Sequence, residues 1–577
     1  MNHIMYYLRS SPFVFDRYFI YCFVVSISSH LLHCIMVGLI PRLGAILLAL
    51  AFFYILFWLF GRIASIATQA KIITSLLVGA FFCIDIFLLI AFSGVLHKDF
   101  VEVFLQTNTA EAGEFAMFYL TPMVVLAILS FVMLSFVYLR YATIHKIASL
   151  RMTYFLLSLA IIGIGFTIGQ NMTKPSYALY RANILLRSFD AIYAAIDDTN
   201  AYIKQFAALD SDLDAFLREN YDTRGGDNPS FHAAHTYITK NTATIPNIVI
   251  IIGESTQRNY MSLYSTDALD TNPILRTIDS RNLVVFGDVI SPAVHTDQSL
   301  RKVLTFSNND NEAQIPWYKT MNLIDIFRLA GYHTTWISNQ EALSIYGNAP
   351  EIIARRSDRV VFSGFGTYNL RHDGVILDLY DKLKGMDNHQ KNLYVFHLMG
   401  THQKYARRYP LAYDVFSAKD IASTWLTDKQ RSVSAQYANA LLYNDFIVSE
   451  IIKRFADSDS LVFYFSDHGD EVYDFRDFLG HADNMASRFM VEIPFMVYMS
   501  DGFLTRYPSI AECVQKVRNL PFMIDDFIHA LLDIAGIETL DFDSTRSVFH
   551  AKYDAKHKRK VYGRDYDSEM KQVARRY

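Results

Sequence analysis

The chain has 577 residues, of which 52% are hydrophobic and 19% are charged. Residues 1–171 contain about 9% charged residues and are slightly basic, whereas the remainder contains about 23% and is acidic, as in water-soluble domains. This composition excludes a disordered chain, a uniform solenoid and a protein that is embedded in the membrane throughout. The acidic second part has no basic stripe, which argues against nucleic acid as the main partner.

Residues 1–171 are predicted to form a transmembrane domain of five helices, because crossing about 30 Å of hydrocarbon takes roughly 17 to 25 apolar residues. The spans are expected near Tyr18–Leu39, Leu43–Phe60, Ile72–Val95, Pro122–Leu139 and Tyr154–Ile168. Most Lys and Arg residues at their ends fall on one side if the spans alternate. The positive-inside rule therefore predicts a cytoplasmic N-terminus and places everything after Ile168 outside the membrane.

No cleaved signal peptide is expected, because Asp16 and Arg17 precede the first span and no small-residue cleavage site follows it. Asp85 lies inside the third span, where a charge costs about 3 kcal/mol or more. It therefore has either a function of its own or a structural role as a polar contact between helices.

The outer loop between the third and fourth spans contains Thr107 and Glu111. These residues are four positions apart, so they would share one face of a helix at the bilayer surface. A hydroxyl and a carboxylate there can hold a cationic lipid headgroup, although a solvated interfacial loop would have the same sequence.

Residues 172–245 have apolar positions at helical spacing, followed by a break at Gly225–Pro229. This pattern predicts amphipathic helices that bridge the two parts of the chain, and then a linker. Of the four cysteines, only Cys513 follows the predicted spans, so the exported part cannot form an intramolecular disulfide.

Residues 246–577 are predicted to form an α/β sandwich with a largely parallel sheet. Buried β-branched runs such as Asn247–Gly253 and Leu461–Phe465 alternate with helical patterns such as Ala438–Phe455. Active sites of such sheets lie at the carboxyl ends of the strands.

Polar residues follow several of these predicted strands. They are Glu254, His402, Asp467, His468 and His481. Each alone is more typical of a satisfied core residue than of a ligand. Together, carboxylates and imidazoles that converge at one sheet edge predict a site for a divalent metal, with zinc the best match.

The candidate nucleophile is Thr296, in the segment Ser291–Leu300. A threonine hydroxyl is a poor nucleophile at neutral pH unless a metal or a base removes its proton. The segment by itself favours an ordinary N-cap before a helix that begins near Ser299.

Together with the five-span anchor, several segments resemble the bacterial phosphoethanolamine transferases, inner-membrane enzymes with a periplasmic domain of the alkaline-phosphatase/sulfatase-like type. The segments are Gly253–Arg258, the one around Thr296, His397–His402 and Ser466–Tyr473. The resemblance covers nearly the whole chain.

This resemblance implies roles for individual residues. Glu254, Thr296, Asp467 and His468 would bind a catalytic zinc, with Thr296 as the nucleophile. His402 and His481 would bind the transferred phosphate or a second zinc. Thr107 and Glu111 would hold the donor lipid, although Val103 replaces a polar position of that loop. Asn339 and Gln340 would contact substrate.

Within the family, further segments look most like the branch that acts on the heptose of the lipopolysaccharide inner core. They include Leu304–Asn308, Trp336–Gln340 and Thr545–Val548. The lipid A branch usually has periplasmic disulfides, which this chain cannot form there.

The implied reaction moves phosphoethanolamine from phosphatidylethanolamine to lipopolysaccharide through a covalent intermediate on Thr296 and zinc. The added ammonium would reduce the negative surface charge that attracts antimicrobial peptides. The alternatives are a glycerol-phosphate transferase of the lipoteichoic acid synthase type and a catalytically silent membrane sensor. A sulfatase is not expected, because the Cys/Ser-x-Pro-x-Arg motif is missing near Thr296.

Overall fold

The computed structural model divides into two compact units, residues 1–200 and 201–577. It describes residues 14–36, 40–41, 43–62, 67–106, 119–143, 145–147, 158, 182–211, 216–217, 237–340, 348–364, 371–384 and 389–575. Each unit has its own cluster of buried apolar residues.

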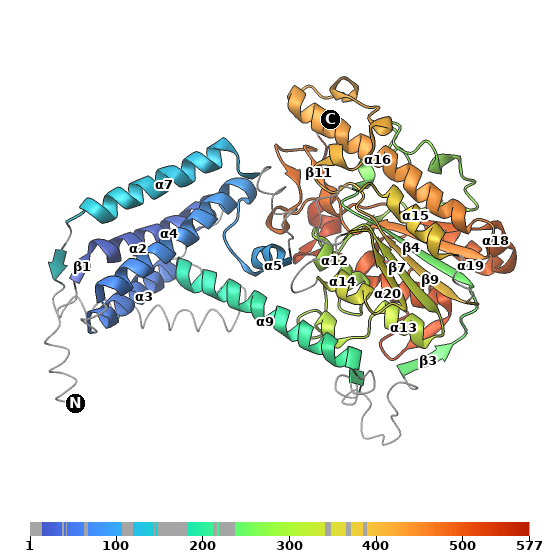
Figure 1. Ribbon diagram of the computed structural model, residues 1–577, viewed down its shortest axis with the longest axis horizontal. Helices are drawn as coiled ribbons and strands as arrows, with labels where there is room; N and C mark the ends of the chain where they lie inside the picture. The colour runs from blue at the N-terminus through green and yellow to red at the C-terminus, as the bar shows by residue number, and fades with distance from the viewer. Residues whose placement is uncertain are drawn as a thin grey trace, which may run out of the picture. The chain divides into compact units, whose positions relative to one another are not determined.

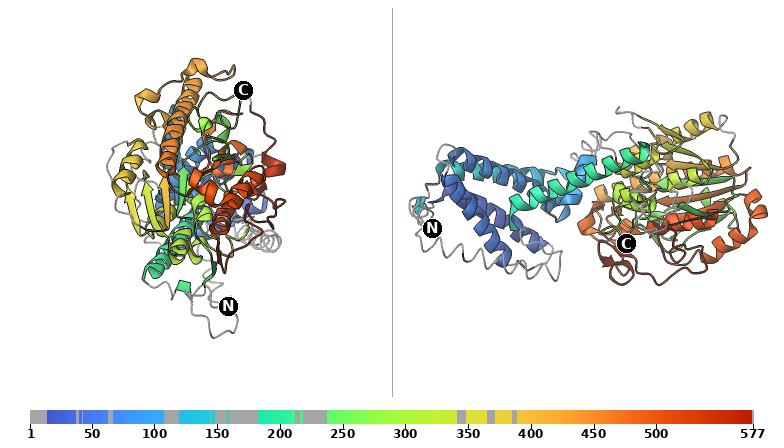
Figure 2. Two further views of the ribbon diagram at one scale, coloured as in Figure 1. Left: turned by 90° about the vertical axis from the view of Figure 1, so that its right-hand side faces the viewer. Right: turned by 90° about the horizontal axis from the view of Figure 1, so that it is seen from below.

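The first unit contains four described helices that are long and apolar enough to cross a membrane. They are α2 (Arg17–Met36), α3 (Leu43–Arg62), α4 (Ala67–Phe92) and α7 (Pro122–Tyr141), and they lie side by side (Figure 2). Four of the five predicted spans are thereby confirmed as helices. The fifth, at residues 154–168, lies outside the described residues except for Ser158.

The remaining described elements of this unit are short, apart from one long helix. They are β1 (Val14–Asp16), β2 (His145–Ile147), α5 (Lys98–Gln106) and α9 (Ile184–Ser211), of which α9 continues into the second unit. The long helix α9 begins where bridging amphipathic helices were predicted.

Asp85 connects three elements of the first unit. Its carboxylate accepts hydrogen bonds from Ser29 Oγ of α2 at 2.6 Å and from the backbone N–H of Leu96 at 3.0 Å. It also forms an ion pair with Arg187 of α9, and both side chains are at least 90% buried. These contacts favour the structural role for Asp85, because a buried carboxylate is stabilised when it is paired and hydrogen-bonded.

The second unit is built on a seven-stranded sheet with the order β5-β13-β10-β4-β9-β7-β8. The strands are β4 (Asn247–Gly253), β5 (Leu283–Val285), β7 (His333–Ser338), β8 (Arg359–Phe362), β9 (Asn392–His397), β10 (Ser460–Ser466) and β13 (Phe495–Met499). Strands β10, β4, β9, β7 and β8 are parallel, and β13 is antiparallel to its neighbours. The predicted, largely parallel sheet is confirmed.

Helices cover both faces of this sheet, because alternate residues of each central strand point to opposite sides. In β4, Ile248 and Ile250 pack with α13 (Leu323–Leu329) and α20 (Phe527–Ala535). Val249 packs on the other face with α15 (Gly374–Leu383) and α16 (Asp428–Phe455) (Figure 1). The sandwich predicted from the sequence is therefore present.

The other helices and paired strands surround this core. The helices are α12 (Thr296–Val303), α14 (Ala349–Ala354), α17 (Arg488–Val491), α18 (Asp501–Arg506) and α19 (Pro508–Val517). The two-stranded pairs are β3 (Ile238–Asn241) with β15 (Ile537–Thr539), β6 (Val289–Ile290) with β14 (Phe522–Met523), β11 (Glu471–Val472) with β12 (Leu479–Gly480), and β16 (Lys560–Val561) with β17 (Arg564–Asp565).

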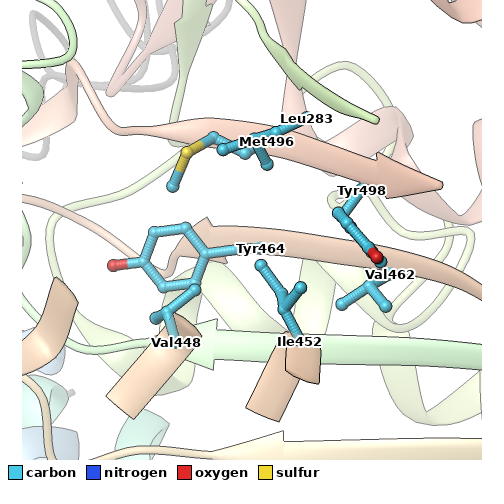
Figure 3. A pocket seen from close by; sticks show the side chains of 7 residues that line it. All are labelled: Leu283, Val448, Ile452, Val462, Tyr464, Met496 and Tyr498. Atoms are coloured by element: carbon cyan, nitrogen blue, oxygen red, sulfur yellow. The ribbon is translucent and has the colours of Figure 1, made fainter. Parts of the chain in front are cut away.

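An apolar gap lies between this sheet and α16. It is lined by Leu283, Val448, Ile452, Val462, Tyr464, Met496 and Tyr498 (Figure 3). The gap leaves no room for a water molecule. It is therefore a packing feature of the core and not a ligand site.

Candidate metal centre

Four of the predicted site residues meet at the carboxyl ends of β4 and β10. Thr296 Oγ1 donates toward the carboxylate of Glu254, 3.1 Å from Oε2 and 3.3 Å from Oε1, and it lies 3.5 Å from His468 Nε2. His468 Nε2 is in turn 3.4 Å from Glu254 Oε1 and 3.5 Å from Asp467 Oδ2. The side chains of Glu254, Asp467 and His468 are almost completely buried.

The parallel pairing of β4 and β10 explains why Glu254 and Asp467 are neighbours. Gly253 is in register with Ser466, so the next residue of each strand projects from the same edge. The backbone N–H of Ser255 donates to Asp467 Oδ1 at 3.0 Å and fixes the orientation of that carboxylate.

Thr296 reaches the same point because its segment is tied to the end of β10. Both Ser291 Oγ and Ser299 Oγ donate to the carbonyl oxygen of Asp467, at 2.5 and 2.7 Å. Thr296 is the first residue of α12, and His295 takes the N-cap position without a side-chain capping bond. The helix N-terminus therefore adds a positive partial charge beside the Thr296 hydroxyl.

The charges of this cluster fit a bound cation. Burial, with repulsion from Glu254, raises the pKa of Asp467 to about 7. Burial opposes protonation of His468, but Asp467 and Glu254 outweigh it and raise its pKa to about 10. Asp467 Oδ2 is buried and accepts no hydrogen bond. A divalent cation would neutralise the two carboxylates and satisfy this oxygen.

The donor set of two carboxylates, an imidazole and a hydroxyl suits zinc, and the ligand atoms of Glu254, Asp467 and His468 lie within 4.8 Å of one another. A second cluster of His468, Asp470 and His481 meets the same spacing. There, however, Asp470 already accepts hydrogen bonds from Tyr405 Oη and His481 Nδ1, both at 2.7 Å. The first cluster is therefore the better metal site.

His402 enters the site from the loop after β9. Gly400 allows this approach, because its φ is +48° and an added Cβ would lie 2.8 Å from backbone atoms of Glu254. Thr401 is hydrogen-bonded through its backbone N–H and its Oγ1 to the carbonyl oxygen of Glu254. The ring of His402 is approached by Arg408, whose Nη2 lies 3.3 Å from Nδ1.

The predicted substrate contacts Asn339 and Gln340 follow β7. Gln340 donates to Glu254 Oε2 at 3.2 Å and to the Leu398 carbonyl oxygen. Asn339 is buried and donates to Asp373 Oδ1 at 2.8 Å. Gln340 thus lies against the metal cluster, whereas Asn339 braces a neighbouring loop, and contact of either with substrate stays a prediction.

The predicted donor-lipid residues Thr107 and Glu111 lie outside the described residues. Val103, the departure from the family pattern, lies in α5.

Some residues of the site were not singled out by the sequence analysis. His295, next to Thr296, has its ring centroid 5.0 Å from that of His481. Asp470 and Tyr405 connect the loops of His481 and His402. Asp470 lies in the segment Ser466–Tyr473, which carries the resemblance. Its position two residues after His468 was the only feature of the sequence that could have identified it as a site residue.

The sequence model of the sulfatase family matches residues 246–537, just over half of the chain. The chain belongs to the sulfatase family. This family domain contains every residue of the metal cluster described above.

Among its relatives, the chain is similar to phosphoethanolamine transferase EptC of Escherichia coli K12, with 32% identity over 317 residues, which is 53% of each chain. It is 28% identical over 317 residues to phosphoethanolamine transferase CptA of Salmonella typhimurium, again over 53% of each. The chain spans about half the length of the curated relatives it matches.

Two solved structures are also similar. The zinc complex of the C-terminal periplasmic domain of E. coli EptC is 29% identical, with a TM-score of 0.53 over 58% of this chain and 96% of that one. The integral membrane lipooligosaccharide phosphoethanolamine transferase A of Neisseria meningitidis has a TM-score of 0.60 over 92% of this chain and 97% of that one. Because the identity is only 17%, this structural similarity shows a shared fold and nothing more.

Proposed function

We propose that this protein is a zinc-dependent transferase that moves phosphoethanolamine from phosphatidylethanolamine to lipopolysaccharide. The observation that carries the proposal is the position of the Thr296 hydroxyl, 3.1 to 3.5 Å from two members of a metal-binding cluster and at the start of a helix. The E. coli relative crystallised with zinc supports the choice of metal.

In the first step, Thr296 Oγ1 attacks the phosphorus of the donor, and the bond from phosphorus to the glycerol oxygen breaks. The Thr296 hydroxyl gives up its proton along the hydrogen bond that it donates toward Glu254, and the glycerol oxygen takes up a proton as it leaves, so that diacylglycerol departs as an alcohol. Zinc bound by Glu254, Asp467 and His468 would lower the pKa of the hydroxyl and compensate the phosphoryl charge. The product is a phosphoethanolamine ester on Thr296.

In the second step, an acceptor hydroxyl or phosphate of lipopolysaccharide attacks the same phosphorus. A histidine of the site takes the acceptor proton, and Thr296 Oγ1 leaves and is protonated again. The inner-core heptose is the proposed acceptor, from the resemblance of segments such as Leu304–Asn308, with a lipid A phosphate as the alternative.

The proposed setting is the bacterial inner membrane, with a cytoplasmic N-terminus and the catalytic unit in the periplasm. Four apolar helices and the Lys and Arg residues at their ends support it. Both substrates are membrane lipids, so an anchored catalyst meets donor and acceptor at one surface. Thr107 and Glu111 are proposed to hold the donor headgroup.

The test uses the purified full-length chain with phosphatidylethanolamine. Intact-mass analysis should show a phosphoethanolamine adduct on the peptide that contains Thr296. Thr296→Ala should keep its zinc and lose both adduct and transfer, while Thr296→Ser, which retains a hydroxyl, should form the adduct. A glycerol-phosphate adduct would instead indicate the lipoteichoic acid synthase type of reaction, and an active Thr296→Ala variant would exclude Thr296 as nucleophile.

The acceptor is tested separately by mass spectrometry of lipopolysaccharide from cells with and without the gene. Loss of phosphoethanolamine from the core heptose would support the core branch. Loss from lipid A would move the chain to the other branch, and no loss from either would refute a lipopolysaccharide acceptor.

A further inference from the structure

His402 and His481 approach the same site from different loops, and each ring has a different partner at Nδ1. For His402 the partner is the guanidinium of Arg408, with Nη2 3.3 Å away. For His481 the partner is the carboxylate of Asp470, with Oδ1 2.7 Å away. The chemistry of these two partners determines which ring nitrogen carries the proton.

A guanidinium has five N–H donors and no acceptor. Arg408 can therefore only donate to Nδ1 of His402, so Nδ1 must hold a lone pair. The single proton of the neutral ring then lies on Nε2. Rotating the ring by 180° would put a C–H group against the guanidinium, which loses this hydrogen bond.

Arg408 is itself held firmly by the loop that it stabilises. Its Nε donates to the carbonyl oxygen of His402 at 3.0 Å, and its Nη2 donates to the carbonyl oxygen of Gln403 at 2.8 Å. The guanidinium is thus hydrogen-bonded to both the backbone and the ring of His402, and the ring cannot rotate without losing its hydrogen bond from Arg408.

His481 shows the opposite arrangement. Asp470 accepts a hydrogen bond from Tyr405 Oη at Oδ2, and its Oδ1 faces His481 Nδ1. A carboxylate in this position accepts a hydrogen bond from Nδ1–H, so the lone pair of the neutral His481 ring lies on Nε2. Tyr405 belongs to the same turn as Arg408, so one short segment supports both histidines.

We propose that Arg408 and Asp470 fix the two histidines in opposite tautomers, so that His402 presents an Nε2–H donor and His481 presents an Nε2 lone pair. The inference rests on the proposed transfer reaction and assigns a different role in it to each histidine. His402 donates a hydrogen bond to a phosphoryl oxygen and does not bind metal, whereas His481 offers a hydrogen-bond acceptor at Nε2. Arg408 and Asp470 are positioning residues.

The first experiment compares glutamine and asparagine at position 402 in the full-length enzyme. The amide nitrogen of glutamine can occupy the position of Nε2, whereas that of asparagine falls near Nδ1. We expect His402→Gln to retain most of the transfer activity and His402→Asn to lose about 10²- to 10³-fold, as for one donor to a developing oxyanion. Zinc content should be unchanged in both.

Arg408→Met should lower kcat with little change in zinc content, and the exposed neighbour provides the control variant Arg407→Met, which should leave activity unchanged. Equal activities of His402→Gln and His402→Asn, or loss of zinc from both, would overturn the proposal.

The second experiment reads the tautomers directly and does not depend on activity. In the ¹⁵N spectrum of histidine-labelled enzyme, the His402 signals, assigned by their loss in His402→Gln, should show a non-protonated Nδ1 and a protonated Nε2. Arg408→Met should change the His402 signals and leave those of His481 in place. The reverse tautomer at His402 would refute the inference even if transfer is confirmed, and the predicted tautomers without any transfer would refute only the proposed function.

Discussion

Removing and rebinding the metal gives a quantitative test of the candidate centre. Without metal, burial and repulsion from Glu254 hold the pKa of Asp467 at about 7, and the two carboxylates hold that of His468 at about 10. At pH 7, His468 is therefore an imidazolium that still holds its titratable proton, and Asp467 is protonated in about half of the molecules. Zinc binds only the deprotonated forms, so binding should release about 1.5 protons.

The sign and the pH dependence follow from these pKa values. Proton release should approach two near pH 6 and one near pH 8, because Asp467 titrates between them. The apparent affinity for zinc should therefore rise with pH, by a factor of about 30 per unit around pH 7.

The assay is calorimetric titration of metal-free, full-length enzyme in buffers with different heats of ionisation, which yields the proton count directly. Thr296→Ala provides the baseline, because it keeps both titrating ligands and removes the hydroxyl. Any excess release by the wild type would then belong to Thr296. Proton release near zero in Thr296→Ala, or zinc affinity independent of pH, would refute the assignment of Asp467 and His468 as ligands.

Three further predictions concern buried residues of the first and second units. Replacing either Asp85 or Arg187 alone by a neutral residue should reduce the free energy of unfolding in detergent by about 3 to 5 kcal/mol, whereas the double replacement should cost less than the sum; additive effects would contradict their coupling. Burial, with the charge of Arg546, lowers the pKa of His529 from 6.5 to about 3. The stability that neutral His529 contributes is therefore fully present above pH 6.5 and decreases as the pH is lowered, with a loss of about 2 kcal/mol at pH 5. His529→Asn should flatten this loss in thermal unfolding, and an unchanged pH slope would argue against it. Gly400→Ala should impair zinc binding and transfer, because the added Cβ would lie 2.8 Å from backbone atoms of Glu254; a fully active variant would show that this loop can shift.

The sequence was most informative where strand order determines geometry. Glu254 and Asp467 directly follow buried runs, and parallel strands end at one edge, so their proximity could be predicted without coordinates. Thr296 was harder to place, because 42 positions separate it from Glu254 and the serine contacts that hold it cannot be read from spacing. Its segment alone favoured an N-cap, and the resemblance was needed to predict that Thr296 is the nucleophile.

Distant side-chain partners that do not follow neighbouring strands were not predictable. Asp85 could be recognised as unusual, but its partner Arg187 is 102 positions away on a different helix. Arg408 looks like a surface charge in the sequence, yet it contacts the His402 ring. Such pairings depend on the tertiary packing of two elements, about which local composition carries no information.

The described carboxylates around the site fall into two kinds, and the difference indicates where the metal belongs. Asp373 is buried but accepts hydrogen bonds from the backbone N–H groups of Met399 and Gly400 and from Asn339. Asp470 is likewise satisfied by Tyr405 and His481.

Asp467, in contrast, has a buried Oδ2 that accepts no hydrogen bond. It faces the Glu254 carboxylate and lies 3.5 Å from the ring of His468, which is protonated in the metal-free protein. Two buried carboxylates that share one imidazolium leave a negative charge, which a divalent cation would compensate. This oxygen of Asp467 therefore supports our proposal that the metal binds beside Thr296, while the satisfied oxygens of Asp470 fit a residue that orients His481.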